Sequence, residues 1–340
     1  MPDAESQIRS VTVIGDGQMG LVMADALAVG GHQVRLWGPF EEHVAAIRDS
    51  RLSDRLPGFK LPDTIEVTPD AVAALDGSQL VICAIPCQFI RPVFEKLAGA
   101  INSKPVLVSV AKGIEIATLQ RPTEVLQEVL GDRCGSTVCF SGPTIATELA
   151  EHMVATMVAA SQDEQASLLT QSVFATPWLR VYTNDDLIGV EIAGAVKNVV
   201  AIAAGIIDGL RFGTNAKSAL LARGLAEIVR FGVALGAQSE TFFGIAGVGD
   251  LATTCFSPDG RNRSCGEAIG SGMLLQEYLD TSHCVVEGVA TTQSIMQLVD
   301  RFGIEAPIMT AVHSVLFENV TPRDAIQKLL AREAGREIVG

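Results

Sequence analysis

The sequence lacks the cysteine spacing on which a disulfide framework or a structural zinc site depends. Its seven cysteines are an odd number, and no two of them form a C-x-x-C pair. This argues against disulfide-linked and tetrathiolate-zinc folds. Buried free thiols are the ordinary state of cysteine in the reducing cytosol, so we expect a cytoplasmic protein.

Basic charge is also scarce. Lysine and arginine total 25 against 39 aspartate and glutamate residues, which gives a formal net charge of −14. Nucleic acids and anionic membrane surfaces bind to basic faces, so we expect neither as a partner. The balance still leaves room for a small basic pocket, which is all that a phosphate ester requires.

Long uninterrupted apolar runs are absent as well. The longest, over residues 192–210, contains Lys197, Asn198 and Asp208 and predicts a buried helix rather than a membrane span. The N-terminal segment MPDAESQIRS is polar and acidic, so no signal peptide is expected. Apolar residues make up 48% of the 340 and charged residues 19%, which is enough for a sizeable core in two domains.

Motifs of hydrolases and zinc enzymes are missing too, since neither H-E-x-x-H nor G-x-S-x-G occurs. The histidines have neither metal-binding nor catalytic spacing, so we expect no metal and interpret them as structural. They are His32, His43, His152, His283 and His313.

Short apolar runs that alternate with helical patterns fill the first half of the chain, and this alternation predicts a doubly wound parallel sheet. The predicted strands are 11–15, 33–37, 80–85, 106–110, 137–140, 153–160 and 179–183, with helices over 18–29, 88–98 and 122–130. After residue 187 the pattern becomes helical, interrupted by a glycine-rich region, 241–266, that we expect to be a loop. The predicted fold class is α/β: a Rossmann-like domain, 1–188, followed by an all-α domain, 189–340.

A G-x-G-x-x-G motif follows the first strand and opens the first helix, and its glycines are Gly15, Gly17 and Gly20. The first allows a tight turn, the second lets the backbone approach a pyrophosphate, and the third lets helix and strand pack closely. The free N–H groups of the helix start can bind the anion. The motif predicts dinucleotide binding, with an ordinary structural turn as the alternative.

Two details of this motif are unusual. Asp16 places a carboxylate beside the expected pyrophosphate, so we expect repulsion unless it faces solvent, and we expect Asp16→Ala to tighten NAD(P)H binding a few-fold. The acidic residue that holds an NAD ribose about 20 positions further on is missing, because the second strand ends in Trp37-Gly38-Pro39. No arginine stands there for a 2′-phosphate either, although Arg35 is close, so the choice between NAD and NADP stays open.

Lys197 is the most informative single residue. It lies in an apolar helical segment with almost no polar face, and an unpaired buried ammonium costs several kcal/mol. Burial lowers a lysine pKa toward the range that suits acid–base catalysis. Asp208 is three turns away, about 16 Å, so a partner has to come from elsewhere in the fold. The alternative is a structural lysine that reaches solvent with its charged end.

Three further segments carry groups suited to an anionic substrate. Lys112 ends a strand at the edge where open α/β sheets bind ligands, and Gly142 and Thr144 lie at the start of a helix. Asp250 can accept a hydrogen bond from a substrate hydroxyl or pair with Lys197. The neighbouring residues Arg261 and Asn262, eleven positions further on, can bind a phosphate. Solvated charges and ordinary helix caps are the alternatives at these positions.

Together these residues resemble the bacterial NAD(P)-dependent glycerol-3-phosphate dehydrogenases, collinearly from Val11 to about Leu330. The resemblance also rests on Arg223-Gly224-Leu225-Ala226-Glu227 and Val285-Val286-Glu287-Gly288. It implies interconversion of sn-glycerol 3-phosphate and dihydroxyacetone phosphate by hydride transfer, in the supply of glycerol 3-phosphate for phospholipid synthesis.

The resemblance also assigns roles to individual residues. Lys197 is implied as the catalytic acid and base. The implied substrate contacts are Lys112, Gly142, Thr144, Lys197, Asp250, Gly260, Arg261 and Asn262. The implied cofactor contacts are Gly15, Gly17, Gln18, Met19, Gly20, Pro39, Lys112, Ala146, Arg261, Val285 and Glu287. Asp16, Gln18-Met19, Gly38-Pro39 and Gly260 depart from the usual family residues.

Two other functions compete with this interpretation. A β-hydroxyacid dehydrogenase also joins a Rossmann domain to a helical domain with an essential lysine, but it prefers a carboxylate substrate to a phosphate ester. A protein that senses NAD(P) without turnover would explain the unusual loop, but not the retention of Lys197 and Asp250. The apolar second domain favours a homodimer.

Overall fold

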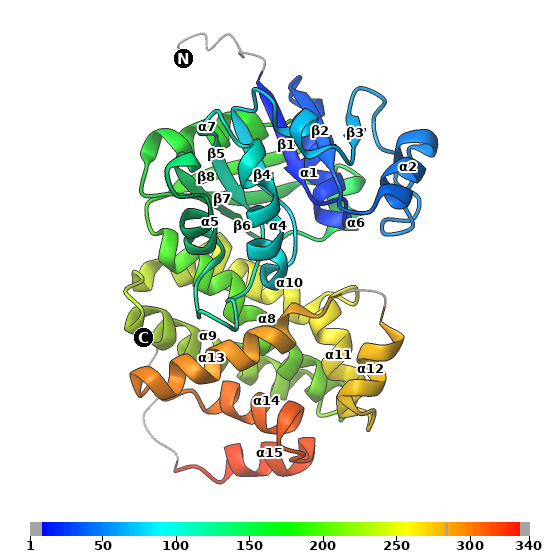
Figure 1. Ribbon diagram of the computed structural model, residues 1–340. Helices are drawn as coiled ribbons and strands as arrows, with labels where there is room; N and C mark the ends of the chain where they lie inside the picture. The colour runs from blue at the N-terminus through cyan, green and yellow to red at the C-terminus, as the bar shows by residue number, and fades with distance from the viewer. Residues whose placement is uncertain (1–8, 283–284, 334–340) are drawn as a thin grey trace.

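The computed structural model describes residues 9–282 and 285–333, so His283, Cys284 and the chain ends lie outside it. An α/β unit is followed by a helical unit, as Figure 1 shows. The sheet has the order β3-β2-β1-β4-β5-β6-β7-β8 and is parallel except between β6 and β7. Its strands are β1 Ser10–Ile14, β2 Gln33–Trp37, β3 Glu66–Thr68, β4 Leu80–Cys83, β5 Val106–Ser109, β6 Thr137–Ser141, β7 Ala155–Ala160 and β8 Leu179–Asn184. The predicted fold class is confirmed.

Both faces of this sheet are covered, which explains why its central strands are continuous apolar runs. Side chains of α1, α2, α6 and α7 form the core on one face, and those of α3, α4 and α5 form the core on the other. These helices are α1 Gln18–Val29, α2 Glu41–Ser50, α3 Ala71–Leu75, α4 Ile90–Leu97, α5 Pro122–Leu130, α6 Ala146–Ala150 and α7 Glu164–Phe174. Because strand order reverses between β1 and β4, a ligand crevice is expected at their carboxyl ends.

The helical unit is built around α8, Leu187–Gly209, which is buried along nearly its whole length. By length and composition this helix could span a membrane, but every residue of its apolar stretch is buried inside the fold, as in a core helix. The surrounding helices are α9 Gly213–Ala234, α10 Asp250–Phe256, α11 Arg261–Gly270, α12 Leu275–Thr281, α13 Glu287–Phe302, α14 Pro307–Phe317 and α15 Pro322–Leu330.

The expectation of a loop over 241–266 is wrong. This region forms short 3₁₀ and π turns and then α10 and the first part of α11. Its glycines serve close packing rather than chain reversal: a Cβ at Gly266 would overlap the carbonyl of Ile202 on α8, and one at Gly247 would overlap the carbonyl of Phe242. The start of α11 is therefore fixed directly against α8.

A buried carboxylate joins the two units. Glu191 on α8 accepts hydrogen bonds from Arg121 Nη1 at 2.6 Å, from Thr123 N at 2.9 Å and from Thr123 Oγ1 at 2.7 Å. Burial raises the pKa of Glu191, and the Arg121 guanidinium opposes that rise. These bonds hold α8, and the lysine it carries, against α5 of the sheet unit.

Candidate active site

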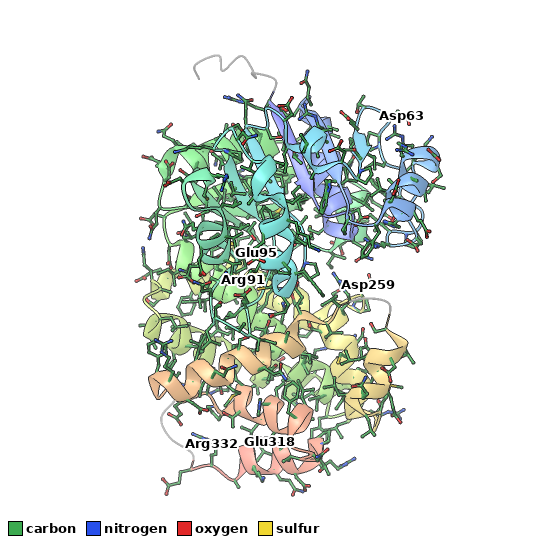
Figure 2. All side chains as sticks on the ribbon, in the orientation of Figure 1. Asp63, Arg91, Glu95, Asp259, Glu318 and Arg332 are labelled. Atoms are coloured by element: carbon green, nitrogen blue, oxygen red, sulfur yellow. The ribbon has the colours of Figure 1, made fainter. Side chains whose placement is uncertain are left out.

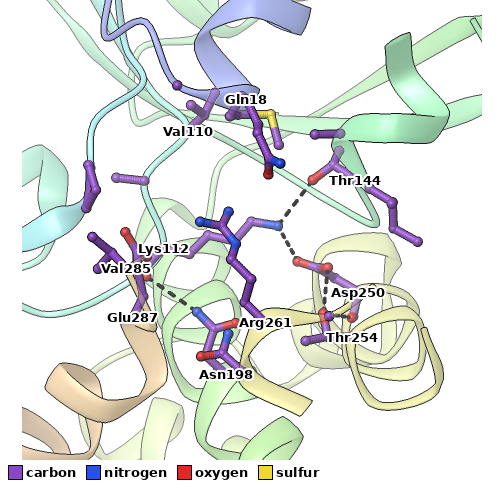
Figure 3. A pocket seen from close by; sticks show the side chains of 18 of the residues that line it. Gln18, Val110, Lys112, Thr144, Asn198, Asp250, Thr254, Arg261, Val285 and Glu287 are labelled. Atoms are coloured by element: carbon purple, nitrogen blue, oxygen red, sulfur yellow. Dashed lines mark hydrogen bonds and ion pairs between the residues drawn. The ribbon is translucent and has the colours of Figure 1, made fainter. Parts of the chain in front are cut away.

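A pocket of about 320 Å³ lies between the carboxyl edge of the sheet and the helical unit. Figure 3 shows its side chains, and Figure 2 places Asp259 on the helical side where the two units meet. The lining residues with polar or charged side chains are Gln18, Lys112, Thr144, Thr147, Lys197, Asn198, Asp250, Thr253, Thr254, Ser257, Asp259, Arg261, Asn262 and Glu287. The pocket coincides with the crevice that the strand order predicts.

The glycine loop has the shape of a phosphate cradle. Gly15 has a φ of +117°, and a Cβ there would lie 2.5 Å from the carbonyl oxygen of Ala84. A Cβ at Gly20 would overlap the carbonyl of Gly15, whereas one at Gly17 would meet nothing within 4 Å. Gly17 caps α1 without a side-chain hydrogen bond. The open space at Gly17 and the free N–H groups of α1 fit a dinucleotide pyrophosphate.

Lys197 is 5% exposed and points from α8 into the pocket. Its Nζ donates to Thr254 Oγ1 and lies 3.0 Å from Asp250 Oδ1. Burial lowers the pKa of Lys197 to about 8, although Asp250 acts in the opposite direction. The partner that the sequence required from elsewhere is therefore Asp250, while Asp208 pairs with Lys217 at 2.6 Å.

Asp250 holds a second lysine as well. Lys112 Nζ lies 2.6 Å from Asp250 Oδ2 and donates to the carbonyl oxygen of Gly142 at 2.9 Å, as Figure 3 shows in part. Asp250 itself is 1% exposed. One buried carboxylate thus separates two ammonium groups, and the net positive charge of the three side chains suits an anionic substrate.

The β6–α6 turn supplies acceptors and a hydroxyl beside Lys112. Gly142 has a φ of +153°, and a Cβ there would lie 2.7 Å from the carbonyl oxygen of Thr156, so a side chain would be strained and crowded. Thr144 Oγ1 donates to the Gly142 carbonyl at 3.1 Å. The turn therefore presents Thr144 to the pocket in a fixed orientation.

The first residues of α11 form the opposite wall. Gly260 caps this helix without a side-chain hydrogen bond, so its first N–H groups are open to a ligand. Arg261 extends from α11 into the pocket beside Lys112, as Figure 3 shows. Asn262 Oδ1 accepts from Gly288 N at 2.9 Å, which ties α11 to α13. A phosphate group placed here would meet a helix N-terminus and a guanidinium together.

Glu287 begins α13 at the sheet side of the pocket. Its Oε1 accepts from Cys87 N at 3.2 Å, and burial raises its pKa to about 7, against the effect of Arg261 and Lys112. Val285 lines the same wall and is exposed. After Lys197, Glu287 is therefore the second titratable group of the pocket with a pKa near neutral pH.

Most residues of the predicted site line this pocket, but four do not: the substrate candidate Gly142, whose carbonyl accepts from Lys112, and three cofactor candidates. Gly15 and Gly20 are the two ends of the glycine loop and are packed against backbone carbonyl groups, and Pro39 lies exposed in the turn after β2. The prediction did not include Asn198, whose side chain lies 3.5 Å from the Lys112 carbonyl, or Thr254. Thr254 follows Asp250 by four residues, so a helical rather than a loop assignment would have placed it on the same face.

The premise of the Asp16 expectation is wrong. The Asp16 side chain is 3% exposed and does not face solvent, and its charge is compensated by Arg55 Nη1 at 2.5 Å. His43 Nδ1 lies 2.6 Å from its other oxygen. Only an uncompensated carboxylate would repel the pyrophosphate, so the expected tightening by Asp16→Ala loses its physical basis.

The strand order, the glycine cradle and the buried lysine in a crevice with a cationic wall define a dinucleotide-dependent dehydrogenase of the Rossmann type. Models described as NAD-dependent glycerol-3-phosphate dehydrogenase N-terminus and C-terminus match residues 10–167 and 186–327. The chain belongs to this family, whose members are NAD(P)-dependent oxidoreductases acting on a CH–OH group.

Individual relatives agree along nearly the whole chain. The chain is 42% identical to a glycerol-3-phosphate dehydrogenase [NAD(P)+] of Citrifermentans bemidjiense, covering 96% of this chain and 98% of that protein. It is 42% identical to one of Geobacillus kaustophilus, covering 97% of each. The crystal structure of glycerol-3-phosphate dehydrogenase from Coxiella burnetii superposes with a TM-score of 0.91 at 34% identity, covering 96% of this chain and 99% of that one.

Within the described residues, no group of three or more histidine, cysteine, aspartate or glutamate side chains is placed to hold a metal ion. His43, His152 and His313 each pair with a carboxylate instead.

Proposed function

We propose that this protein interconverts sn-glycerol 3-phosphate and dihydroxyacetone phosphate, with Lys197 as the catalytic acid and base. The observation that carries the proposal is the Lys112–Asp250–Lys197 arrangement at the base of a pocket whose walls are the glycine loop and the start of α11. It provides a proton donor of suitable pKa and a cationic surface in one crevice.

In the reduction, Lys197 Nζ, in its ammonium form, donates a proton to the carbonyl oxygen at C2 of dihydroxyacetone phosphate. In the oxidation, the neutral amine accepts the proton from the C2 hydroxyl. The nicotinamide, when bound, supplies or accepts the hydride at C2. Asp250 and Thr254 fix the direction of Nζ, and Asp250 stabilises its charged form. A pKa of about 8 lets this group serve in both directions near neutral pH.

The remaining substrate and cofactor contacts are assigned from the two walls of the pocket, the start of α11 and the glycine loop. We assign the substrate phosphate to the start of α11, with Gly260, Arg261 and Asn262, and the substrate hydroxyl groups to Lys112, Asp250 and the Gly142–Thr144 turn. The Gly15–Gly20 loop, including Gln18 and Met19, would hold the pyrophosphate. Further cofactor contacts are proposed at Pro39, Lys112, Ala146, Arg261, Val285 and Glu287.

We also propose a metabolic role, a location and an oligomeric state for the protein. The reduced product, glycerol 3-phosphate, suits a role in phospholipid synthesis. We propose a cytoplasmic homodimer with small molecules as its ligands and with neither nucleic acid nor membrane as a partner. The division into units is proposed at 1–188 and 189–340, supported by the passage from β8 into α8.

An assay that follows NADH or NADPH absorbance with dihydroxyacetone phosphate tests the function. We expect turnover with this ketone and much less with 3-oxo acids, because the wall at Arg261 is suited to a phosphate ester. Turnover of an oxo acid in preference would identify a β-hydroxyacid dehydrogenase. Nucleotide binding without turnover of either substrate would contradict the enzymatic proposal.

Arg261→Ala is expected to raise KM for dihydroxyacetone phosphate by roughly 10- to 150-fold, since a charge-assisted hydrogen bond contributes about 1.5–3 kcal/mol. Steady-state kinetics measure the effect. Because Arg261 is also a proposed cofactor contact, some loss of NAD(P)H affinity is compatible. The matched control is Arg301→Ala, which replaces an arginine in the last turn of α13 and should leave KM unchanged. An unchanged KM in the Arg261 variant would rule out the assigned phosphate site.

The pKa of Lys197 predicts opposite pH profiles for the two directions. Reduction requires the ammonium form, so its kcat/KM is expected to fall about tenfold per pH unit above pH 8. Oxidation requires the amine, so its kcat/KM should rise toward pH 8 and then level. Glu287 titrates near pH 7 in the same pocket, and Glu287→Gln separates its contribution. Profiles that stay flat from pH 7 to about 10 in both directions would contradict the role of Lys197.

A further inference from the structure

Two unusual features of the nucleotide-binding region, Asp16 and Gly38, have one structural explanation. The glycine loop lies against the end of β2, where Gly15 N donates to the Trp37 carbonyl at 2.9 Å. A Cβ at Gly38 would lie 2.5 Å from Asp16 Oδ2. The Asp16 carboxylate therefore occupies the space next to the end of β2, where related dinucleotide-binding domains carry the side chain that contacts the adenosine ribose.

Asp16 is placed to anchor other side chains rather than to bind the ribose itself. One oxygen accepts from Arg55 Nη1 at 2.5 Å and the other lies 2.6 Å from His43 Nδ1. The opposite ring nitrogen of His43 lies 3.2 Å from Asp54 Oδ1 and 3.3 Å from Ser53 Oγ. The loop after α2 is thus held on Asp16 through two side chains, and the carboxylate is 3% exposed.

Arg55, in contrast, is partly exposed. Its side chain is 36% exposed, and the guanidinium carbon lies 6.0 Å from the ring centroid of Phe40, which is itself exposed at the start of α2. Only Nη1 is hydrogen-bonded within the described part of the chain, to Asp16. The N–H groups on Nη2 and Nε remain for a ligand.

The other arginines near β2 and α2 are engaged elsewhere. Arg35 donates to the carbonyls of Ala74 and Asp76, at 3.2 and 2.6 Å. Arg51 donates to the Ile65 carbonyl at 2.8 Å. The first turn of α2 adds two exposed carboxylates, Glu41 and Glu42. Arg48, in the last turn of α2, pairs with Asp49 at 3.5 Å. Of these arginines, Arg55 is therefore the one held beside Asp16 at the end of β2.

We infer that Arg55 recognises the 2′-phosphate of NADPH and gives the protein a preference for NADPH over NADH. A planar guanidinium can form two parallel hydrogen bonds to a phosphate, and its pairing with Asp16 limits the orientations it can take. The 2′-hydroxyl of NADH offers no such charge. The inference rests on dinucleotide binding at the Gly15–Gly20 loop and specifies which dinucleotide this loop prefers.

Fluorescence titration of NADPH and NADH gives the dissociation constants without requiring turnover. Wild-type protein is expected to bind NADPH at least about tenfold more tightly than NADH. Arg55→Gln should weaken NADPH binding by about tenfold or more and NADH binding by less than about threefold. Arg48→Gln removes an arginine from the last turn of α2, where it pairs with Asp49, and should change neither constant.

A competition experiment on the wild-type protein keeps the inference testable if loss of Arg55 leaves Asp16 with His43 as its one partner and the variant does not fold. We expect 2′,5′-ADP to displace NADPH at a concentration at least about tenfold lower than 5′-ADP. Equal displacement, or equal weakening of both dinucleotides in Arg55→Gln, would overturn the inference and leave Arg55 a structural residue of its loop. Failure of both dinucleotides to bind would contradict the nucleotide site itself.

Discussion

Lys197→Ala is expected to lower kcat by about 10²–10⁴-fold while leaving the dissociation constant of NAD(P)H nearly unchanged. The variant removes the group proposed to exchange a proton with the C2 oxygen, but it removes no part of the glycine cradle. Asp250 keeps its 2.6 Å pairing with Lys112, so the pocket retains a partner for its buried carboxylate. Steady-state kinetics with fluorescence titration measure the two quantities separately.

Lys217 provides a matched control for this experiment. It is also a largely buried lysine, 8% exposed, and it is paired with a carboxylate, Asp208, at 2.6 Å. Lys217 does not line the pocket. Lys217→Ala is therefore expected to lower stability while leaving kcat within a few-fold of wild type. If Lys197→Ala keeps more than about a tenth of wild-type turnover, the acid–base assignment is wrong.

The features that could be predicted from the sequence are those that depend on neighbours along the chain. The β-α-β unit around the glycine motif is one example, because its strand and helix differ in apolar periodicity and the glycines mark the turn. Lys197 is another, since a charge in an apolar helix is unusual whatever the tertiary structure. In both cases the local pattern was sufficient.

Features that depend on pairing between distant segments could mostly not be predicted, although the pairing of Lys197 with Asp250 is one of the two roles that the sequence offers for Asp250. Arg55 follows Asp16 by 39 residues and lies in a loop with no regular pattern, so the sequence does not indicate that the charge of Asp16 is compensated. The helical turns between residues 245 and 270 could not be predicted because this region is rich in glycine, and the sequence alone does not distinguish a glycine needed for close packing from one needed for a turn. Only the packing of α11 on α8 distinguishes the two uses.

Asp250→Asn is expected to lower kcat/KM for reduction by about 10²-fold or more at neutral pH, and to lower the free energy of unfolding by about 3–5 kcal/mol. Asparagine keeps the shape and a carbonyl oxygen but removes the charge between two buried ammonium groups. Lys112 and Lys197 would then repel each other without compensation, and the pKa of Lys197 should fall further below its ordinary value. Less of the proton donor would be present at pH 7.

The loss of activity in Asp250→Asn is expected to depend on pH. Lowering the pH restores the ammonium form of Lys197, so reduction by the variant should recover part of its deficit in acidic buffer, and the descending limb of its profile should move below pH 8. Asp259→Asn removes a carboxylate that lines the same pocket but is exposed. It should leave the pH at which kcat/KM for reduction begins to fall, and the midpoint of unfolding in urea, near their wild-type values. A limb that stays near pH 8 in Asp250→Asn would show that Asp250 does not control the protonation of Lys197.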